Sequence, residues 1–447
     1  MKLQVELVSQ EFIKPNSPTP ENLRLYELSL LDQISANVYN PVVYFFASNG
    51  TNPIRKSNQV KESLSDILTH YYPFAGRIID NKFIDCNDEG VPYLVASVMC
   101  KLNDVVDNPV PGELNKLVPF ELDCPSDLAL GIQVNVFECG GIAIGACISH
   151  KIADGLSASS FINSWAASSH GQADLVRTQF ISATLFPPKN NLHGYDPNVY
   201  VTYKNIITKM FMFDASAIEA LKAKYAATSI FGTSLGSRKS PTRVEALSTF
   251  IWSRFLAVTP GDHFESDEPR GFCALLHCVN LRSRMEPPLP GYSFGNYFGD
   301  ALTIVPIPSA NNSSEVVYYN LMRKVMEQTK KFDKEYISKI REGGHEYLNF
   351  LKDSSNRILQ GEMTWFDFTS LCRFPFYDAD FGWGKPIWVG MPAWPYKNLV
   401  IFVDTKSGGG IEAYVSLKEE DMAKLENDKE LPVYVSPTGS KHVRSLL

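Results

Sequence analysis

Three histidines that are each followed four positions later by an aspartate are the first sign of chemistry in this sequence. The pairs are His150/Asp154, His170/Asp174 and His263/Asp267. A neutral imidazole accepts a proton at physiological pH, so each of these histidines is a candidate general base. The spacing alone is a weak signal in a chain of 447 residues. The surroundings of each histidine must therefore separate them.

His150 has the surroundings that a catalytic base needs. It follows an apolar run from Gly141 to Ser149 and precedes Gly155, which opens a segment with helical spacing. A base at the end of a buried strand is held rigidly and is shielded from water. The spacing leaves two alternatives open for His150, a general base or a core histidine satisfied by backbone groups. Asp154 could likewise orient the base or only hold the loop through a salt bridge.

The other two histidines lie in polar surroundings. His170 stands between Ser-Ser and Gly-Gln, and His263 lies in an acidic stretch between two prolines. Both patterns are typical of surface loops. Neither histidine is therefore a strong candidate for catalysis.

A second candidate motif is Gly232-Thr-Ser234-Leu-Gly236, which matches the nucleophile elbow of serine hydrolases. That motif requires a strand before it and a helix directly after it. Here it lies in a polar stretch that ends at Pro241, which indicates a loop. A serine hydrolase built on Ser234 is kept as the alternative function.

The pentapeptide Asp380-Phe381-Gly382-Trp383-Gly384 is too specific to be a frequent chance match. Its two glycines indicate tight backbone, and its aromatic residues indicate a packed corner. These properties favour an architectural role for the segment over a chemical one.

Composition excludes several classes of protein. The formal net charge is −7, the pI is about 5.7 and the sequence has no long basic run, which argues against nucleic acid and anionic membranes as main partners. No stretch approaches 18 apolar residues, and the charged N-terminal segment does not resemble a signal peptide. The eight cysteines are dispersed without Cys-x-x-Cys pairs, so we expect free thiols, no zinc site and a cytoplasmic location.

Strand-like and helix-like segments alternate along the chain, which predicts a mixed α/β protein in two halves. We expect strands at residues 42–47, 132–137, 141–149, 206–213, 272–281, 399–404 and 410–417. We expect helices at residues 58–72, 155–168, 215–226 and 242–256, and a long helix within 311–340. Residues 186–200 are rich in Pro, Gly and Asn and predict an irregular connector. The expected division is an N-terminal domain at 1–185, a crossover loop at 186–203 and a C-terminal domain at 204–447.

Two motifs together carry a resemblance to a known family. Ser149-His-Lys-Ile-Ala-Asp-Gly155 and Asp380–Gly384 resemble the signatures of the plant BAHD acyltransferases, in the same order and at a similar separation. Further agreement lies in Ser29–Asp32, Tyr72–Arg77, Cys86–Gly90, Asn280–Arg284 and Gly295-Asn296. The resemblance covers essentially the whole chain. Within the family, the sequence is most similar to the vinorine synthase-like group, which mainly acetylates alkaloid and terpenoid hydroxyls.

The resemblance implies two similar-sized domains, each a mixed β-sheet with helices, in a chloramphenicol-acetyltransferase-like fold with a channel at their interface. An acyl-CoA, most often acetyl-CoA, would enter from one face and a small-molecule alcohol from the other. His150 would take the hydroxyl proton, and the alkoxide would attack the thioester without an acyl-enzyme. The resemblance implies a monomer with no metal and no permanently bound cofactor. A non-catalytic binding protein of the same fold is the remaining alternative.

The resemblance also implies roles for other residues. Asp154 would point away from His150 and pair with Arg282, so its role would be structural. Asp380, Gly382, Trp383 and Gly384 would be structural as well and lie away from the channel.

Stabilisation of the oxyanion needs a hydrogen-bond donor near the developing charge. Thr369 matches a family threonine in this region, and Asn296 is a weaker candidate. Many family members have Trp two residues after that threonine, whereas this chain has Leu371. The smaller side chain is expected to widen the acceptor pocket.

The phosphates of CoA require basic groups at one mouth of the channel. The candidates are Arg238, Lys239, Ser240 and Arg243, around the start of the helix expected at 242–256. Helix N-termini favour phosphate. The alternative is that these residues form a solvated surface loop.

Overall fold

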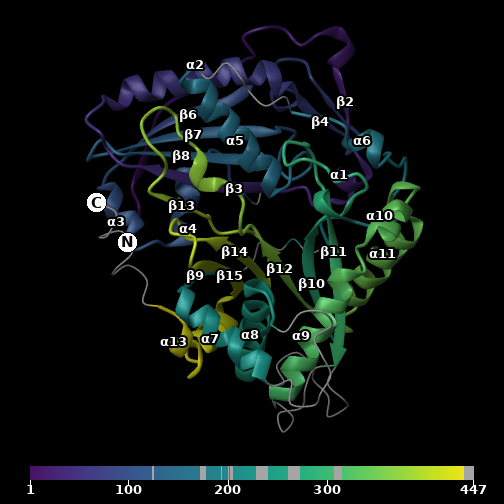
Figure 1. Ribbon diagram of the computed structural model, residues 1–447. Coiled ribbons are helices and arrows are strands. Elements are labelled where there is room, and N and C mark those ends of the chain that lie inside the picture. The colour runs from purple at the N-terminus through teal and green to yellow at the C-terminus, as the bar shows by residue number, and fades with distance from the viewer. Residues whose placement is uncertain are drawn as a thin grey trace.

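The chain folds into two six-stranded sheets with helices packed against them (Figure 1). This description rests on a computed structural model and covers residues 1–122, 125–171, 178–192, 194–199, 201, 205–227, 240–259, 272–306 and 315–436. The first sheet comes almost wholly from the N-terminal half, and the second comes from the C-terminal half.

The first sheet is mixed and has the order β1-β6-β7-β8-β3-β13. Its strands are β1 (Val5–Ile13), β3 (Tyr39–Phe46), β6 (Val91–Val98), β7 (Leu130–Phe137), β8 (Ile142–Ser149) and β13 (Trp388–Gly390). β6 and β7 run parallel, and the other neighbours are antiparallel. Every residue of β8 is buried, as its continuous apolar run predicts for a strand covered on both faces. A smaller sheet joins β2 (Leu25–Glu27), β5 (Phe83–Asp85) and β4 (Arg77–Ile79).

The second sheet is also mixed and has the order β11-β10-β12-β14-β15-β9. Its strands are β9 (Ile206–Phe213), β10 (Phe272–Asn280), β11 (Phe298–Pro306), β12 (Met363–Ser370), β14 (Leu399–Asp404) and β15 (Ile411–Lys418). β10, β12 and β14 run parallel to one another. β13 lies between β12 and β14 in sequence but pairs with β3 of the first sheet. The two halves are therefore joined through backbone pairing as well as through side chains.

Helices cover the two sheets. Longer helices are α2 (Pro53–His70), α5 (Gly155–Ser169), α7 (Ala215–Ala227), α8 (Arg243–Val258), α9 (Glu315–Lys330), α10 (Lys334–Arg341), α11 (His345–Leu359) and α12 (Glu419–Glu426). Short ones are α1 (Leu30–Ile34), α3 (Leu102–Val106), α4 (Pro111–Leu114), α6 (Ser182–Leu185) and α13 (Leu431–Tyr434). In Figure 1, α2 and α5 lie together on the first sheet, while α7, α8 and α9 lie on the second.

The strands and helices expected from the sequence are present, with ends that shift by a few residues. The long helix expected within 311–340 is α9, and a second helix, α10, follows it after a break at residues 331–333. Asp333 causes the break, because its side chain accepts a hydrogen bond from the backbone N–H of Tyr336 at 2.9 Å and caps a new helix. The described residues of 186–200 form no helix or strand, as their composition predicts.

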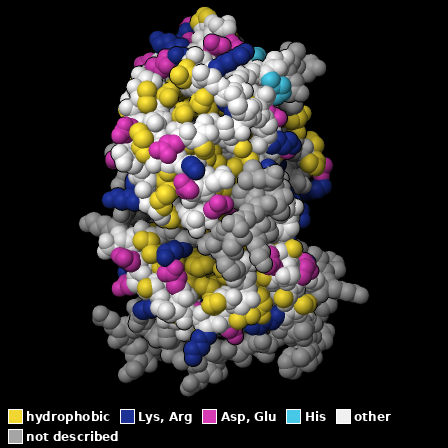
Figure 2. Space-filling model, turned by 90° about the vertical axis from the view of Figure 1, so that its left-hand side faces the viewer, with side chains coloured by type: hydrophobic (Ala, Val, Ile, Leu, Met, Phe, Trp, Pro, Cys, Tyr) yellow, Lys and Arg dark blue, Asp and Glu magenta, His cyan; other side chains and the backbone are white. Residues whose placement is uncertain are grey.

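The distribution of charged side chains on the surface is consistent with the net charge of −7. On the face shown in Figure 2, acidic and basic side chains of the described residues are interspersed rather than gathered by sign. Across the described ranges, every helix is too short or too polar to cross a bilayer.

Candidate active site

His150 lies at the point where β8 ends and the chain turns toward α5. Its backbone N–H donates a hydrogen bond to the carbonyl oxygen of Val38 at 2.9 Å, which fixes the turn to the neighbouring chain. Its ring lies 5.4 Å from the ring of Phe298 on β11, measured between centroids. The imidazole is therefore held between the first sheet, which carries it, and the second sheet, which faces it.

Asn296 determines which nitrogen of His150 carries the proton. The Oδ1 atom of Asn296 lies 3.1 Å from Nδ1 of His150. The amide nitrogen of Asn296 donates to the carbonyl oxygen of His150 at 2.7 Å and to Oδ1 of Asp32 at 2.8 Å. Since both amide protons are used, Oδ1 must accept from Nδ1–H of the imidazole. The proton on Nδ1 leaves Nε2 as the acceptor, which is the form a general base requires.

Asp32 holds Asn296 in this orientation. Its Oδ1 accepts hydrogen bonds from both the backbone N–H and the side-chain amide of Asn296, at 3.0 Å and 2.8 Å. Its Oδ2 accepts from the backbone and hydroxyl of Ser29, which cap α1. Burial raises the pKa of Asp32, and the hydrogen bonds from Ser29 and Asn296 partly offset that rise. Asp32, Asn296 and His150 thus form one connected chain of hydrogen bonds.

The pKa of His150 is lowered from its ordinary value. Burial disfavours the imidazolium, and this effect outweighs the opposing charge of Asp154 and the hydrogen bond to Asn296. The imidazole is consequently neutral at physiological pH and able to accept a proton.

Asp154 is directed to Arg282 rather than to the imidazole. Its two carboxylate oxygens accept from the guanidinium of Arg282 at 2.7 Å and 3.0 Å. They also accept from the backbone N–H groups of Ser157 at 2.9 Å and Tyr297 at 3.0 Å. Burial opposes ionisation of Asp154, but the charge and hydrogen bonds of Arg282 prevail and lower its pKa. The pair ties the start of α5 to the turn after β10, across the two halves.

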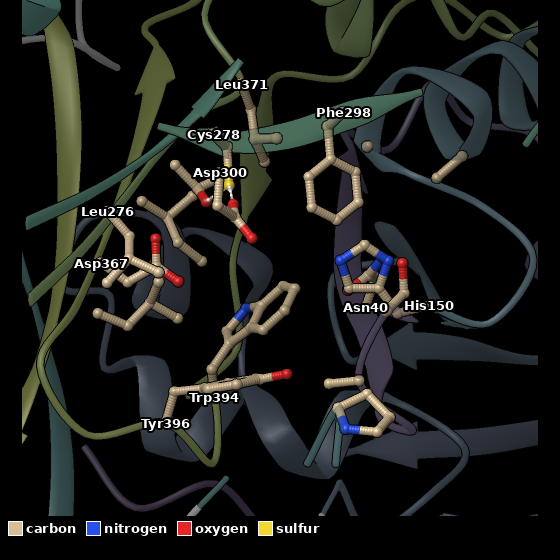
Figure 3. A pocket seen from close by; sticks show the side chains of 18 of the residues that line it. Asn40, His150, Leu276, Cys278, Phe298, Asp300, Asp367, Leu371, Trp394 and Tyr396 are labelled. Carbon is tan, nitrogen blue, oxygen red and sulfur yellow. Dashed lines mark hydrogen bonds between the residues drawn. The ribbon is translucent and has the colours of Figure 1, made fainter. Parts of the chain in front are cut away.

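His150 faces a cavity of about 160 Å³ between the two sheets (Figure 3). Both halves contribute to the walls. They include Asn40, Val42, His150, Gly155, Leu276, Cys278, Phe298, Asp300, Tyr347, Asp367, Thr369, Leu371, Met391, Trp394 and Tyr396. The lining is largely apolar and has a few polar groups, as is typical of small-molecule sites.

Thr369 and Leu371 both line this cavity. The hydroxyl of Thr369 donates to the sulfur of Cys278 at 3.2 Å, a weak acceptor that leaves the hydroxyl able to turn toward a ligand. Leu371 faces Gly155: a Cβ atom at position 155 would lie 2.7 Å from Cδ2 of Leu371. Asn296, the weaker oxyanion candidate, has both amide protons engaged.

The Asp380–Gly384 segment forms a closed turn outside the cavity walls. Oδ1 of Asp380 accepts from the backbone N–H groups of Gly382, Trp383 and Gly384, at 2.8, 3.2 and 3.0 Å. Both glycines have positive φ, 87° and 102°, a conformation that favours glycine. Trp383 stacks on Phe46 of β3 with ring centroids 5.6 Å apart.

Only some of the other candidate residues from the sequence lie within the described ranges. Arg243 begins α8 and pairs with Asp404 at 2.9 Å, and the hydroxyl of Ser240 donates to the carbonyl oxygen of Pro241 at 3.4 Å. Arg238, Lys239, Ser234, His263 and Asp174 lie outside the described residues. His170 is exposed at the end of α5.

Two cavity carboxyl groups, Asp300 and Asp367, were missed by reasoning from the sequence. Each interrupts a short apolar or aromatic stretch, for example Trp365-Phe366-Asp367-Phe368. A carboxylate inside such a run is costly to bury, so this interruption was the signal that could have revealed them.

Comparison with known proteins agrees with the fold and the cavity. A model of the Transferase family matches residues 3–432. The chain is 35% identical to stemmadenine O-acetyltransferase of Catharanthus roseus, with 96% of this chain and 97% of that protein covered. It is 34% identical to a limonoid 21-O-acetyltransferase of Melia azedarach, with 97% and 99% covered.

Solved structures give the same result. The crystal structure of vinorine synthase superimposes with a TM-score of 0.81 at 33% identity, covering 98% of this chain and all of that chain. A structure of F. sporotrichioides TRI101 with coenzyme A and T-2 has a TM-score of 0.67 at 18% identity, covers 92% of this chain and 99% of that one, and supports the fold alone. A two-domain acyltransferase fold with its cavity between the halves is thus defined. The chain belongs to the Transferase family, in agreement with the BAHD motifs.

Proposed function

We propose that the protein transfers an acyl group from acyl-CoA to the hydroxyl of a small-molecule acceptor, with His150 as the general base. Nε2 of His150 accepts the hydroxyl proton, and the alkoxide oxygen attacks the thioester carbonyl carbon. The tetrahedral intermediate collapses, the carbon–sulfur bond breaks, and the CoA thiolate takes the proton from the imidazolium. The ester forms without an acyl-enzyme.

The observation that carries this proposal is the hydrogen-bond chain from Asp32 through Asn296 to Nδ1 of His150. It supplies a neutral imidazole of one tautomer with its free nitrogen available to a ligand. The alternative is a core histidine with both ring nitrogens bonded to backbone groups. His150 differs from it, because Nδ1 contacts the side chain of Asn296 and the ring lines a cavity. Asp154 and Arg282 act as structural support, and Thr369 is the proposed oxyanion donor.

The acyl group is proposed to be acetyl and the acceptor a hydroxyl of a plant specialised metabolite. This step rests on the names of the full-length relatives, which are O-acetyltransferases of stemmadenine and of limonoids. The proposed contacts to the CoA phosphates remain Arg238, Lys239, Ser240 and Arg243. The side chain of Arg243 pairs with Asp404 and is 25% exposed.

The proposed domains are residues 1–185 and 204–447, joined by a crossover loop at 186–203, with β13 returning to the first sheet. We further propose a cytoplasmic monomer. The seven described cysteines are free, as suits a reducing compartment.

The decisive experiment incubates the protein with acetyl-CoA and a panel of terpenoid and alkaloid alcohols, and reads product mass. His150→Ala should lose transfer by about 10² to 10⁴-fold while keeping its melting temperature. His170→Ala is the matched control, because His170 has the same spacing to an aspartate but is exposed. A His150→Ala variant with the wild-type rate would remove the general-base assignment.

The serine hydrolase alternative makes an opposite prediction. It requires an acyl-enzyme and trapping by a serine-directed phosphonate. Transfer that survives in Ser234→Ala would dispose of it. A protein that forms no product with any acceptor would instead favour the non-catalytic alternative.

A further inference from the structure

Asp300 and Asp367 lie on the cavity wall opposite His150. Asp300 is on β11 and pairs in register with Cys278, and Asp367 is on β12 and pairs with Leu276. β10 lies between β11 and β12, and Leu276 and Cys278 are two residues apart on it. All four side chains therefore project from one face of the sheet. Figure 3 shows both carboxyl groups pointing into the space that His150 faces from the other side.

Neither carboxyl group has a cationic partner among the described residues. Asp300 accepts a hydrogen bond from the thiol of Cys278 at 3.3 Å, a weak donor. Oδ1 of Asp367 is buried and accepts none in the described part of the chain. The cavity lining includes no described lysine or arginine, and His150 is neutral. Among the residues that the structure describes, the two acids therefore share a cavity without the counter-charge that buried acids normally have.

Burial without a described counter-charge disfavours ionisation of both carboxyl groups and raises their pKa values. Burial raises the pKa of Asp300. Burial and then the neighbouring charge of Asp300 raise the pKa of Asp367 to about 8. The thiol of Cys278 and the hydroxyl of Tyr347, which face Asp300, have raised pKa values as well, so both stay neutral and add no further negative charge.

Aromatic side chains complete this part of the cavity. Tyr347, Trp394 and Tyr396 line it together with the two acids. The rings of Trp394 and Tyr396 lie 6.2 Å apart between centroids. Aromatic faces attract a cation and also contact the apolar carbon around it. Carboxylates and aromatic rings around one space are the groups that recognise an alkylammonium ion.

We propose that Asp300 and Asp367 bind a protonated amine of the acceptor, so that the preferred acceptor is an alcohol that also carries a basic nitrogen. The inference rests on the proposed acyl transfer and names the acceptor class for it. The ammonium charge would favour the ionised form of both aspartates over the protonated form that Asp367 keeps in the free protein, so it would pair with two carboxylates while the hydroxyl of the acceptor reaches His150 across the cavity. The described residues form no cluster of three or more metal-binding side chains, so a small organic cation is the better occupant.

Neutral carboxylic acids that donate hydrogen bonds to acceptor oxygens are the competing explanation. Such acids would favour carbonyl-rich acceptors and would not distinguish an amine from its carbon analogue. Substitution of either aspartate by asparagine would then be tolerated, because an amide also donates a hydrogen bond.

The test uses pairs of alcohols of the same shape, one with a tertiary amine and one with carbon in place of nitrogen. The ratio of kcat/KM for the two is measured at pH 7 with acetyl-CoA as donor. The wild-type protein should favour the amine by about tenfold or more, mainly through KM. Asp367→Asn and Asp300→Asn should each reduce that ratio by about tenfold, and the double variant should abolish the preference.

Asp353→Asn is the matched control, because Asp353 is an exposed aspartate on α11. It should leave the ratio unchanged. A wild-type protein that acetylates both alcohols with equal kcat/KM, or an unchanged ratio in both aspartate variants, would overturn the amine site while leaving acyl transfer intact. Loss of transfer to every alcohol would instead be a failure of the proposed function.

A second measurement needs no variant. A quaternary ammonium analogue without the hydroxyl should inhibit the wild-type protein competitively with the acceptor, with a Ki about tenfold or more below that of its neutral carbon counterpart. Equal inhibition by the two analogues would contradict the proposal.

Discussion

Two carboxylate sites lie near His150, the buried Asp154 and the half-buried Asp300 and Asp367 of the cavity wall, and they differ in one respect. Asp154 is paired with Arg282 through two hydrogen bonds, and its pKa is lowered. Asp300 and Asp367 have no described cation beside them, and their pKa values are raised. Within the described part of the chain, the first site is electrostatically complete, whereas the second lacks a positive charge.

This difference distinguishes an acid that stabilises the fold from acids that can bind a ligand. A buried acid with a buried arginine holds elements together, and it has no capacity left for a ligand. A buried acid without a partner lowers the stability of the folded state, and it gains a partner only when a ligand enters. The two sites should therefore respond in opposite directions when their acids are neutralised.

The largest effect is expected from Asp154→Ala. The substitution leaves Arg282 buried without its counter-charge and removes the cap of α5, so the free energy of unfolding should fall by about 3–5 kcal/mol. Urea denaturation measures it. Asp378→Ala is the control, since Asp378 pairs with Lys385 at the surface and should change stability by less than about 1 kcal/mol. Equal losses in the two variants would contradict a structural role for the buried pair.

Thr369→Val tests the cavity wall that carries Asp300 and Asp367. Thr369 lies two residues from Asp367 on β12 and lines the cavity. If its hydroxyl stabilises the oxyanion, kcat should fall by about 10²-fold, equivalent to about 2.7 kcal/mol, with KM for the acceptor little changed. Thr369→Ser, which keeps the hydroxyl, should retain most of the rate. A Val variant as fast as the Ser variant would show that the donor lies elsewhere.

Asp380→Ala should affect stability and leave the chemistry intact. The side chain satisfies three backbone N–H groups of its own turn, and their loss should lower the free energy of unfolding by about 1–3 kcal/mol. Asp380→Asn keeps an acceptor oxygen and should lose less. The measurement is thermal melting beside kcat below the transition. A fall in kcat without a fall in melting temperature would place this segment in the reaction.

The sequence predicted the elements well because their causes are local. The apolar run before His150 predicts a buried strand, and the Pro- and Gly-rich stretch at 186–200 predicts a connector. The long helix expected within 311–340 is present as α9, whereas the start of α10 depends on one capping side chain, Asp333, and was not predicted. The family motifs located His150 and Asp154, and the resemblance paired Asp154 with Arg282.

The rest of the site depends on contacts between distant segments. Asn296 meets His150 across 146 positions, and Asp32 meets Asn296 across 264. Asp300 and Asp367 become a pair only because β11 and β12 both flank β10. No spacing in a single sequence encodes such neighbours, so the tautomer of His150 and the acidic wall required the fold.

The effect of opposite sign is a gain in stability in Asp367→Asn. The pKa of Asp367 is about 8 in the folded protein and therefore above its ordinary value, because burial and the charge of Asp300 disfavour ionisation. The folded state retains a proton that the unfolded state has released, so this group lowers stability as pH rises from about 4 to about 8. The variant should be more stable than the wild type by at least about 1 kcal/mol at pH 8 and should lose this advantage near pH 4. The measurement is the urea midpoint of the wild type and of the variant across that pH range, with Asp353→Asn as control. If a partner already neutralised Asp367, as Arg282 neutralises Asp154, the midpoints of wild type and variant would change in parallel with pH, which would contradict the prediction.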